Sequence, residues 1–266
     1  MQRDVVAIGA SAGGIEAVSK LLSHLPAELP AAVLVVIHRP IDPPSYLPEV
    51  LGRLCALPVR FAREGDHLEH GTCLVSPPGR HLSVSKDCRI HLLADGFYRA
   101  HNVDALFMSL AAAIAPRTIG VILSGALKDG TLGLKFLKEA GGIALVQDPA
   151  EASFPDMPEN AAMHDGEIDL IGPIETLAEF ICEQVRLQPL SLGAPRQDDD
   201  AQGLTDRRGL VIYSAFLKRA QSECPECKRS RRQHSSRPGR RWFRNGETPT
   251  CGCPAGVSPK HGCCHW

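Results

Sequence analysis

Three polar residues in this sequence are of the types that perform nucleophilic catalysis. Ser11 lies in the segment GASAGG, His38 in VVIHRP and Asp129 in LSGALKDGTLG. A serine hydroxyl is a weak nucleophile at its ordinary pKa. It becomes reactive when an imidazole removes its proton and a carboxylate orients that imidazole. The three residues therefore indicate a hydrolytic site, provided that the fold brings them to one place.

The glycines around Ser11 are compatible with a second chemistry, the binding of a phosphate. Gly9, Gly13 and Gly14 allow a sharp turn and a helix that starts close to a sheet. The unpaired N–H groups at a helix start suit a phosphate as well as an oxyanion. A dinucleotide site, however, would have glycine at position 11 and an acidic residue where His38 stands. Nucleotide binding is therefore the weaker of the two hypotheses.

The elements expected around these residues alternate between strand and helix up to about residue 187. Strands are predicted at Val5–Ile8, Ala32–Ile37, Val59–Ala62, Cys73–Val75, Leu82–Val84, Ile90–Leu92, Thr118–Leu123, Ile143–Gln147 and Ile168–Leu170. Helices are predicted at Ile15–Leu22, Ser45–Leu54, Val103–Ala115, Thr131–Ala140, Pro158–Met163 and Ile174–Leu187.

This alternation predicts an α/β fold with a doubly wound, mostly parallel sheet flanked by helices. Residues 72–93 contain shorter runs broken by turn residues, and we expect an antiparallel hairpin there. In open parallel sheets, ligands bind outside the carboxyl ends of the strands. Ser11, His38 and Asp129 all follow predicted strands, so the fold is expected to place them along one edge.

Composition divides the chain into a predicted domain at 1–188 and a linker with a basic, cysteine-rich tail at 189–266. Residues 196–266 contain 14 Lys and Arg against 7 Asp and Glu, whereas residues 1–195 carry a net charge of −8. No apolar stretch approaches the roughly 20 residues of a membrane helix, and the start lacks the pattern of a secretory signal. We therefore expect a cytoplasmic protein that does not insert into a membrane.

The tail contains half of a zinc-ribbon signature. Cys224 and Cys227 have the C-x₂-C spacing, and Cys251 and Cys253 are two further candidate ligands, but a second C-x₂-C is missing. A structural zinc site and a disordered tail both remain open. The basic run at 228–244 has few interleaved aromatic residues, so no nucleic-acid partner is expected.

Five segments together resemble the catalytic domain of CheB-type protein-glutamate methylesterases. They are IGASAGGIEAV, VVIHRP, NVDALF, VILSGALKDGTLGL and FPDMPENA, and the similarity runs from about Val5 to Ile181. Members of this family are bacterial chemotaxis enzymes that hydrolyse glutamyl methyl esters on chemoreceptors, and some also deamidate glutamines. The resemblance implies a methylated chemoreceptor-like substrate protein and a cognate methyltransferase as a further partner.

The resemblance also implies a role for each site residue. Ser11 would be the nucleophile, His38 the general base and later general acid, and Asp129 the carboxylate that orients His38. The backbone N–H groups of Ala12 and Ala126 would form the oxyanion hole. No metal or organic cofactor is expected for this chemistry.

Two features depart from the family pattern. The family segment R-P-S-V-D is here Ala100-His101-Asn102-Val103-Asp104, and no receiver domain is expected before the first strand. These departures favour an alternative function, a non-catalytic signalling or scaffold module that retains the fold. We expect a structural role for Asp104, and we expect His81, His91 and His101 to be exposed loop residues.

Overall fold

A computed structural model describes residues 3–39, 45–94, 101–164 and 166–186 of the chain. Its main sheet has seven strands in the order β3-β4-β2-β1-β7-β8-β9, and every neighbouring pair is parallel. These strands are β1 (Val5–Ala10), β2 (Ala32–Ile37), β3 (Val59–Phe61), β4 (Thr72–Val75), β7 (Thr118–Ile122), β8 (Ile143–Gln147) and β9 (Leu170–Gly172). A separate antiparallel pair consists of β5 (Arg80–Val84) and β6 (Ile90–Ala94).

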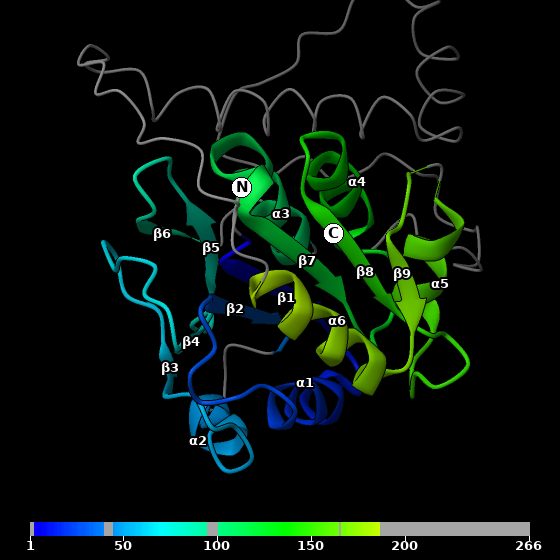
Figure 1. Cartoon of the computed structure of the whole chain (residues 1–266), viewed down its shortest axis with the longest axis horizontal. Coiled ribbons are helices and arrows are strands. Elements are labelled where there is room, and N and C mark those ends of the chain that lie inside the picture. The colour runs from blue at the N-terminus through cyan, green and yellow to red at the C-terminus, as the bar shows by residue number, and fades with distance from the viewer. Residues whose placement is uncertain (1–2, 40–44, 95–100, 165, 187–266) are drawn as a thin grey trace, which may run out of the picture. The chain divides into compact units, whose positions relative to one another are not determined.

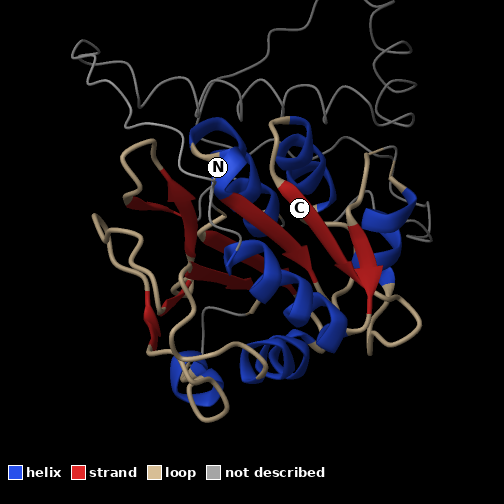
Figure 2. Ribbon diagram, viewed as in Figure 1, coloured by secondary structure: helices blue, strands red, loops and turns tan. Residues whose placement is uncertain are grey.

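Helices cover both faces of the main sheet, as Figures 1 and 2 show. One face packs against α1 (Gly14–Ser23), α2 (Leu47–Leu51) and α6 (Ile174–Arg186). The other face packs against α3 (Asn102–Ala113), α4 (Thr131–Glu139) and α5 (Asp156–Met163). A 3₁₀ turn at Ala115–Arg117 connects α3 to β7.

The strands are apolar on both sides because each side meets a helical layer. In β1, Val6 and Ile8 belong to the core cluster under α1 and α6, whereas Val5 and Ala7 belong to the cluster under α3. Burial of each valine or isoleucine side chain stabilises the fold by roughly 1.5–3 kcal/mol. The continuous apolar runs in the sequence are thus explained by a sheet with no solvent-facing side.

The direction in which strands are added to the sheet reverses at β1. From β1 the chain proceeds to β2 on one side, and it later returns to β7 on the other side. In doubly wound sheets the crevice at this reversal point is the usual ligand site. Ser11 directly follows β1, His38 follows β2, and the loop after β7 contains Asp129.

The predicted fold class is confirmed, and one part of the prediction is corrected. The expected hairpin over residues 72–93 contains only β5 and β6. The first run of that region, β4, instead pairs in parallel with β2 and β3. Cys73, Leu74 and Val75 are all buried, which is typical of an internal parallel strand. Among the described residues, no helix is long and apolar enough to cross a membrane.

Candidate active site

Ser11 lies in the turn that joins β1 to α1. Its N–H donates to the carbonyl oxygen of Ser124 at 3.0 Å, and its carbonyl oxygen accepts from Gly14 at 2.9 Å. Gly13 has a φ of +68°, which glycine adopts without strain, and a Cβ there would come within 2.8 Å of the Ser124 hydroxyl oxygen. The turn therefore requires glycine here, and it leaves Ser11 partly exposed at the edge of the sheet.

Asp129 lies between β7 and α4, where its carboxylate caps the start of α3. Its Oδ2 accepts the N–H of Val103 at 2.9 Å, and its Oδ1 accepts the N–H of Asp104 at 3.0 Å. Asp129 is only 4% exposed, so these two bonds hold its carboxylate in a fixed orientation. The unpaired N–H groups at the start of a helix carry partial positive charge, which stabilises the carboxylate.

His38 contacts this carboxylate from the end of β2. Its Nε2 lies 2.7 Å from Asp129 Oδ2, and its side chain is 22% exposed. Its backbone N–H donates to Ala10 at 3.1 Å, which extends the β1–β2 ladder beyond the strands. Apart from this contact, Nε2 has no hydrogen-bond partner within the described residues. The structure brings two of the three predicted side chains into contact.

The third predicted side chain, that of Ser11, lies beside the same loop. A Cβ built at Gly125 would stand 3.0 Å from the Ser11 Cβ, so the loop that carries Asp129 also packs against Ser11. In the described part of the chain, the Ser11 hydroxyl makes no hydrogen bond to His38. Catalytic hydrogen bonds are often long or misaligned before substrate binds and tighten in the complex.

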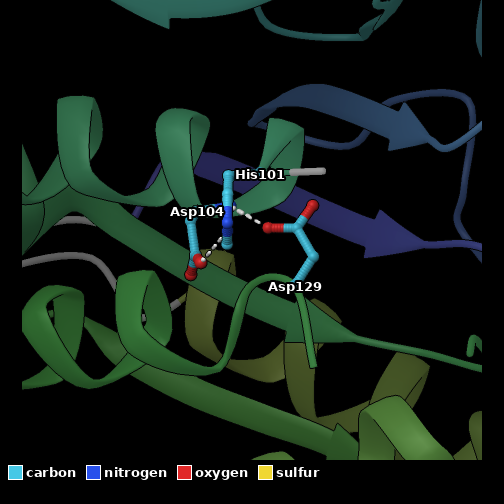
Figure 3. Close-up of side chains that lie close together, drawn as sticks. All are labelled: His101, Asp104 and Asp129. Atoms are coloured by element: carbon cyan, nitrogen blue, oxygen red, sulfur yellow. Dashed lines mark hydrogen bonds and ion pairs between the residues drawn. The ribbon is translucent and has the colours of Figure 1, made fainter. Parts of the chain in front are cut away.

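His101 and Asp104 extend the polar cluster along the first turn of α3 (Figure 3). His101 Nδ1 lies 3.3 Å from Asp104 Oδ2, and Asp104 Oδ1 accepts the N–H of Gly133 in α4 at 2.8 Å. The hydrogen bond to Asp104 raises the pKa of His101. Burial raises the pKa of Asp104, which is 2% exposed. Both shifts favour retention of a proton by this pair.

The same cluster contains a geometric candidate for a metal site. One potential ligand atom from each of His101, Asp104 and Asp129 lies within 4.8 Å of the others. Both oxygens of Asp129 and one oxygen of Asp104 already accept backbone N–H groups. A cation here would also face the positive end of α3. The arrangement is therefore better suited to orienting Asp129 than to holding a metal ion.

The predicted oxyanion-hole residues have free backbone donors. Within the described residues, no acceptor is bonded to the N–H of Ala12 or of Ala126. The carbonyl oxygen of Gly125 accepts from Met157 in α5 at 2.9 Å. In a trans peptide the C=O and N–H point in opposite directions, so the N–H of Ala126 points away from Met157.

Ser124, which was not among the predicted site residues, connects the Ser11 turn to two other segments. Its hydroxyl donates to the carbonyl oxygen of Ala12 at 2.9 Å and accepts the N–H of Phe154 at 3.0 Å. Its own N–H donates to the Oε1 of Gln147, a buried side chain at the end of β8, at 2.8 Å. The signal was available, because Ser124 and Gln147 are polar residues at the carboxyl ends of predicted strands.

The expectation for the three other histidines is corrected. His81 is buried in β5, because that strand covers one side of α3. His91 lies in β6 and pairs with Glu64, and His101 is the N-cap residue of α3. The structural role expected for Asp104 stays a prediction, and its hydrogen bonds to Gly133 and Asp129 agree with it. The predicted tail lies outside the described residues, and so do its four candidate zinc ligands, Cys224, Cys227, Cys251 and Cys253.

Sequence comparisons cover the same part of the chain. The family described as CheB methylesterase matches residues 6–181. A Moorella thermoacetica protein named protein-glutamate methylesterase/protein-glutamine glutaminase is 39% identical over 184 residues, which cover 67% of this chain and 43% of that protein. A Leptospira interrogans protein named putative protein-glutamate methylesterase/protein-glutamine glutaminase is 34% identical over 183 residues, covering 68% of this chain and 94% of that protein.

A solved structure has a similar fold. The crystal structure of the Thermotoga maritima CheB methylesterase catalytic domain matches with a TM-score of 0.62 and 27% identity, covering 69% of this chain and 99% of that chain. The chain spans about half the length of several curated relatives, such as 50% of a Nitratidesulfovibrio vulgaris protein-glutamate methylesterase/protein-glutamine glutaminase 2. The region matched by the family runs from β1 into α6 and includes Ser11, His38 and Asp129.

Proposed function

Because this chain belongs to the CheB methylesterase family, we propose that it is a serine carboxyl-esterase acting on glutamate methyl esters of a chemoreceptor-like protein. The observation that carries the proposal is the 2.7 Å approach of His38 Nε2 to Asp129 Oδ2 at the sheet edge that also carries Ser11. Deamidation of glutamine is a second reaction of the same acyl-transfer type, and the names of the relatives include it.

In the proposed reaction, Ser11 Oγ attacks the ester carbonyl carbon while His38 accepts the hydroxyl proton. Since Asp129 contacts Nε2, the ring nitrogen that remains for Ser11 is Nδ1. Collapse of the tetrahedral intermediate breaks the bond to methoxide, which takes the proton from His38 and leaves as methanol. Water then attacks the acyl-enzyme with His38 again as the base, which releases glutamate and restores Ser11.

The negative charge of the tetrahedral intermediate would be stabilised by two backbone donors. The N–H groups of Ala12 and Ala126 come from the Ser11 turn and from the loop after β7, and both lack an acceptor among the described residues. Loss of one such donor typically costs about 10²–10³ in kcat. The side chains are not used for this role, so alanine suffices at both positions.

Asp129 would fix the tautomer of His38 and stabilise its charged form. Two hydrogen bonds from the start of α3 prevent rotation of the carboxylate. Asp104 supports this arrangement, because it donates its own N–H to Asp129 and links α3 to α4 through Gly133. The proposed mechanism uses only these protein groups and water.

The proposal extends to partners and location. The substrate would be a methylated receptor-like protein, a cognate methyltransferase would form the ester, and the reaction would take place in the cytoplasm. No nucleic-acid partner is proposed. The cysteine-rich tail is proposed as a separate segment from about residue 189 onward, and a zinc ion there would serve structure and not this reaction.

Methanol release from methylated receptor membranes tests the proposed function. The full chain should release methanol, whereas Ser11→Ala and His38→Ala should lose activity by at least about 10³-fold. Ser23→Ala, which changes an exposed serine at the end of α1, is the matched control and should keep full activity. Full activity in Ser11→Ala would exclude the proposed nucleophile.

The non-catalytic alternative is favoured by one observation, the lack of a hydrogen bond from Ser11 to His38 in the described residues. A serine-directed fluorophosphonate distinguishes the two functions. The esterase should be labelled at Ser11, and labelling should disappear in Ser11→Ala. A scaffold should bind the receptor membranes, resist labelling and release no methanol.

A further inference from the structure

Leu127 has an unusual conformation for a leucine. It is one of two non-glycine residues with positive φ in the described part of the chain, with a φ of +68°. A leucine side chain disfavours this left-handed region because its Cβ crowds the following carbonyl group. Leu127 is also 70% exposed, so core packing does not compensate for the unfavourable backbone.

The conformation of Leu127 is enforced by α5. Its N–H donates to Asp156 Oδ2 at 3.2 Å, and its carbonyl oxygen accepts from Asn160 Nδ2 at 3.0 Å. Asn160 Nδ2 also donates to the backbone carbonyl oxygen of Asp156 at 2.7 Å, which fixes the amide between the two acceptors. The fold therefore holds this backbone in place and leaves an apolar side chain in solvent. Strained residues of this kind cluster at functional sites.

Leu127 lies between the two parts of the proposed catalytic site. Two residues before it, Gly125 packs against Ser11, and two residues after it, Asp129 contacts His38. Since consecutive Cα atoms are about 3.8 Å apart, Leu127 is within two steps of both contacts. Its exposed side chain therefore belongs to the loop segment that joins these two contacts.

A second exposed apolar side chain borders the Ser11 turn from another segment. The carbonyl oxygen of Phe154 accepts the N–H of Gly125 at 2.9 Å, and its ring lies 3.1 Å from the position that a Cβ on Gly13 would take. Phe154 is 48% exposed. We call Leu127 and Phe154 the apolar rim of the site.

We propose that the apolar rim contacts the substrate segment around the esterified glutamate, and that Leu127 is a specificity-determining residue for an apolar side chain flanking that glutamate. This inference rests on the proposed function, because it takes the ester-bearing protein as the ligand of the same site. A methyl ester itself is too small to cover both side chains. Contact with the rim therefore requires flanking residues of a protein substrate.

Binding of two synthetic peptides to the full chain tests this inference without requiring turnover. Both peptides contain a glutamate γ-methyl ester, flanked by leucines in one peptide and by asparagines in the other. Ser11→Ala is used so that the ester persists during the measurement. We expect the leucine-flanked peptide to bind about 10-fold more tightly, since burying a leucine side chain is worth about that factor.

The decisive variant adds Leu127→Asn to Ser11→Ala. Asparagine tolerates positive φ, so the loop conformation is kept while the apolar side chain is lost. The preference for leucine should disappear in this variant. It should persist in the matched control Leu54→Asn, which removes an exposed leucine outside the site. A leucine preference that survives Leu127→Asn, or one that is absent from the starting protein, overturns the inference.

Two further measurements distinguish a lost contact from unfolding, and failure of this inference from failure of the proposed function. The melting temperature of Leu127→Asn and Leu127→Gly should equal or exceed that of the starting protein, because both residues relieve the unfavourable φ. Lost binding is then a lost contact and not unfolding. Methanol release by the chain with Ser11 intact tests the proposed function by itself. If the chain releases no methanol but still prefers the leucine-flanked peptide through Leu127, the proposed esterase function is refuted. The proposed contact between the apolar rim and the peptide is then retained.

Discussion

Two aspartates, one at the amino ends of the strands and one at the carboxyl ends, each lie beside a histidine but differ in the chemistry that they allow. Asp4 precedes β1, and its carboxylate lies 3.2 Å from His70 Nε2. Asp129 follows β7, and its carboxylate lies 2.7 Å from His38 Nε2. Each edge thus contains an Asp–His contact, yet only the one at the carboxyl edge lies beside a serine turn.

The difference lies in the groups that hold each carboxylate. Asp4 accepts two hydrogen bonds of 2.8 Å from the guanidinium of Arg117, and this interaction raises the pKa of Arg117. Asp129 instead accepts two neutral backbone N–H groups. The Arg117 charge neutralises Asp4, so His70 adds little. Backbone N–H groups hold both oxygens of Asp129, and Oδ2 also contacts His38.

The largest expected effect is a loss of kcat that occurs when Asp129 is substituted but not when Asp4 is. Asp129→Asn should lower kcat for methanol release by about 10⁴-fold, because an amide stabilises the wrong tautomer of His38. Asp4→Asn should leave kcat within about twofold, because the amino edge of the sheet does not contact substrate. Equal losses of kcat in the two variants would refute the distinction.

The next largest effect is on the free energy of unfolding, and it concerns Arg117 and His70, the two partners of Asp4. Arg117→Met should lower the free energy of unfolding by about 1–3 kcal/mol, since it leaves Asp4 partly buried without its main partner. His70→Gln should cost less than about 1 kcal/mol, because that histidine is exposed and its ion pair is screened. Urea unfolding followed by circular dichroism measures both values. A kcat loss in Arg117→Met comparable to that of Asp129→Asn would contradict the structural role of this pair.

The smallest effect concerns pH and the pair beside Asp129. Between about pH 4 and 6.5, the unfolded chain carries one proton on His101 and Asp104 together. The raised folded-state pKa of His101, caused by Asp104, lets the native pair keep that proton to higher pH. Its contribution to stability is therefore complete below about pH 6.5 and is lost as pH rises through the folded pKa.

Thermal melting between pH 6 and 9 measures this loss. The melting temperature of the unmodified chain should fall by a few degrees more over this range than that of His101→Gln. Arg117→Met removes no group that titrates there, so it should retain the pH dependence of the unmodified chain. Identical pH dependence in His101→Gln would show that the proton is not held by this pair.

Much of the fold could be predicted because hydrophobic periodicity is a local property. The limits of β2 and β8 were predicted to the residue, and both strands are buried on two sides and apolar except for Gln147 at the end of β8. The assignment of β4 to a hairpin was wrong because strand pairing is non-local. Its neighbours are β2 and β3, and nothing within a run of four residues specifies which strand lies beside it.

The sequence by itself determined which chemistry was available. Ser11, His38 and Asp129 each follow an apolar strand, and the direction of parallel strands sends all three to one edge. Only the tertiary structure showed that Nε2 of His38 faces Asp129, that α3 holds that carboxylate, and that α5 holds Leu127 at positive φ. Those contacts join residues more than 20 positions apart, so they depend on how helices and loops pack and not on local residue patterns.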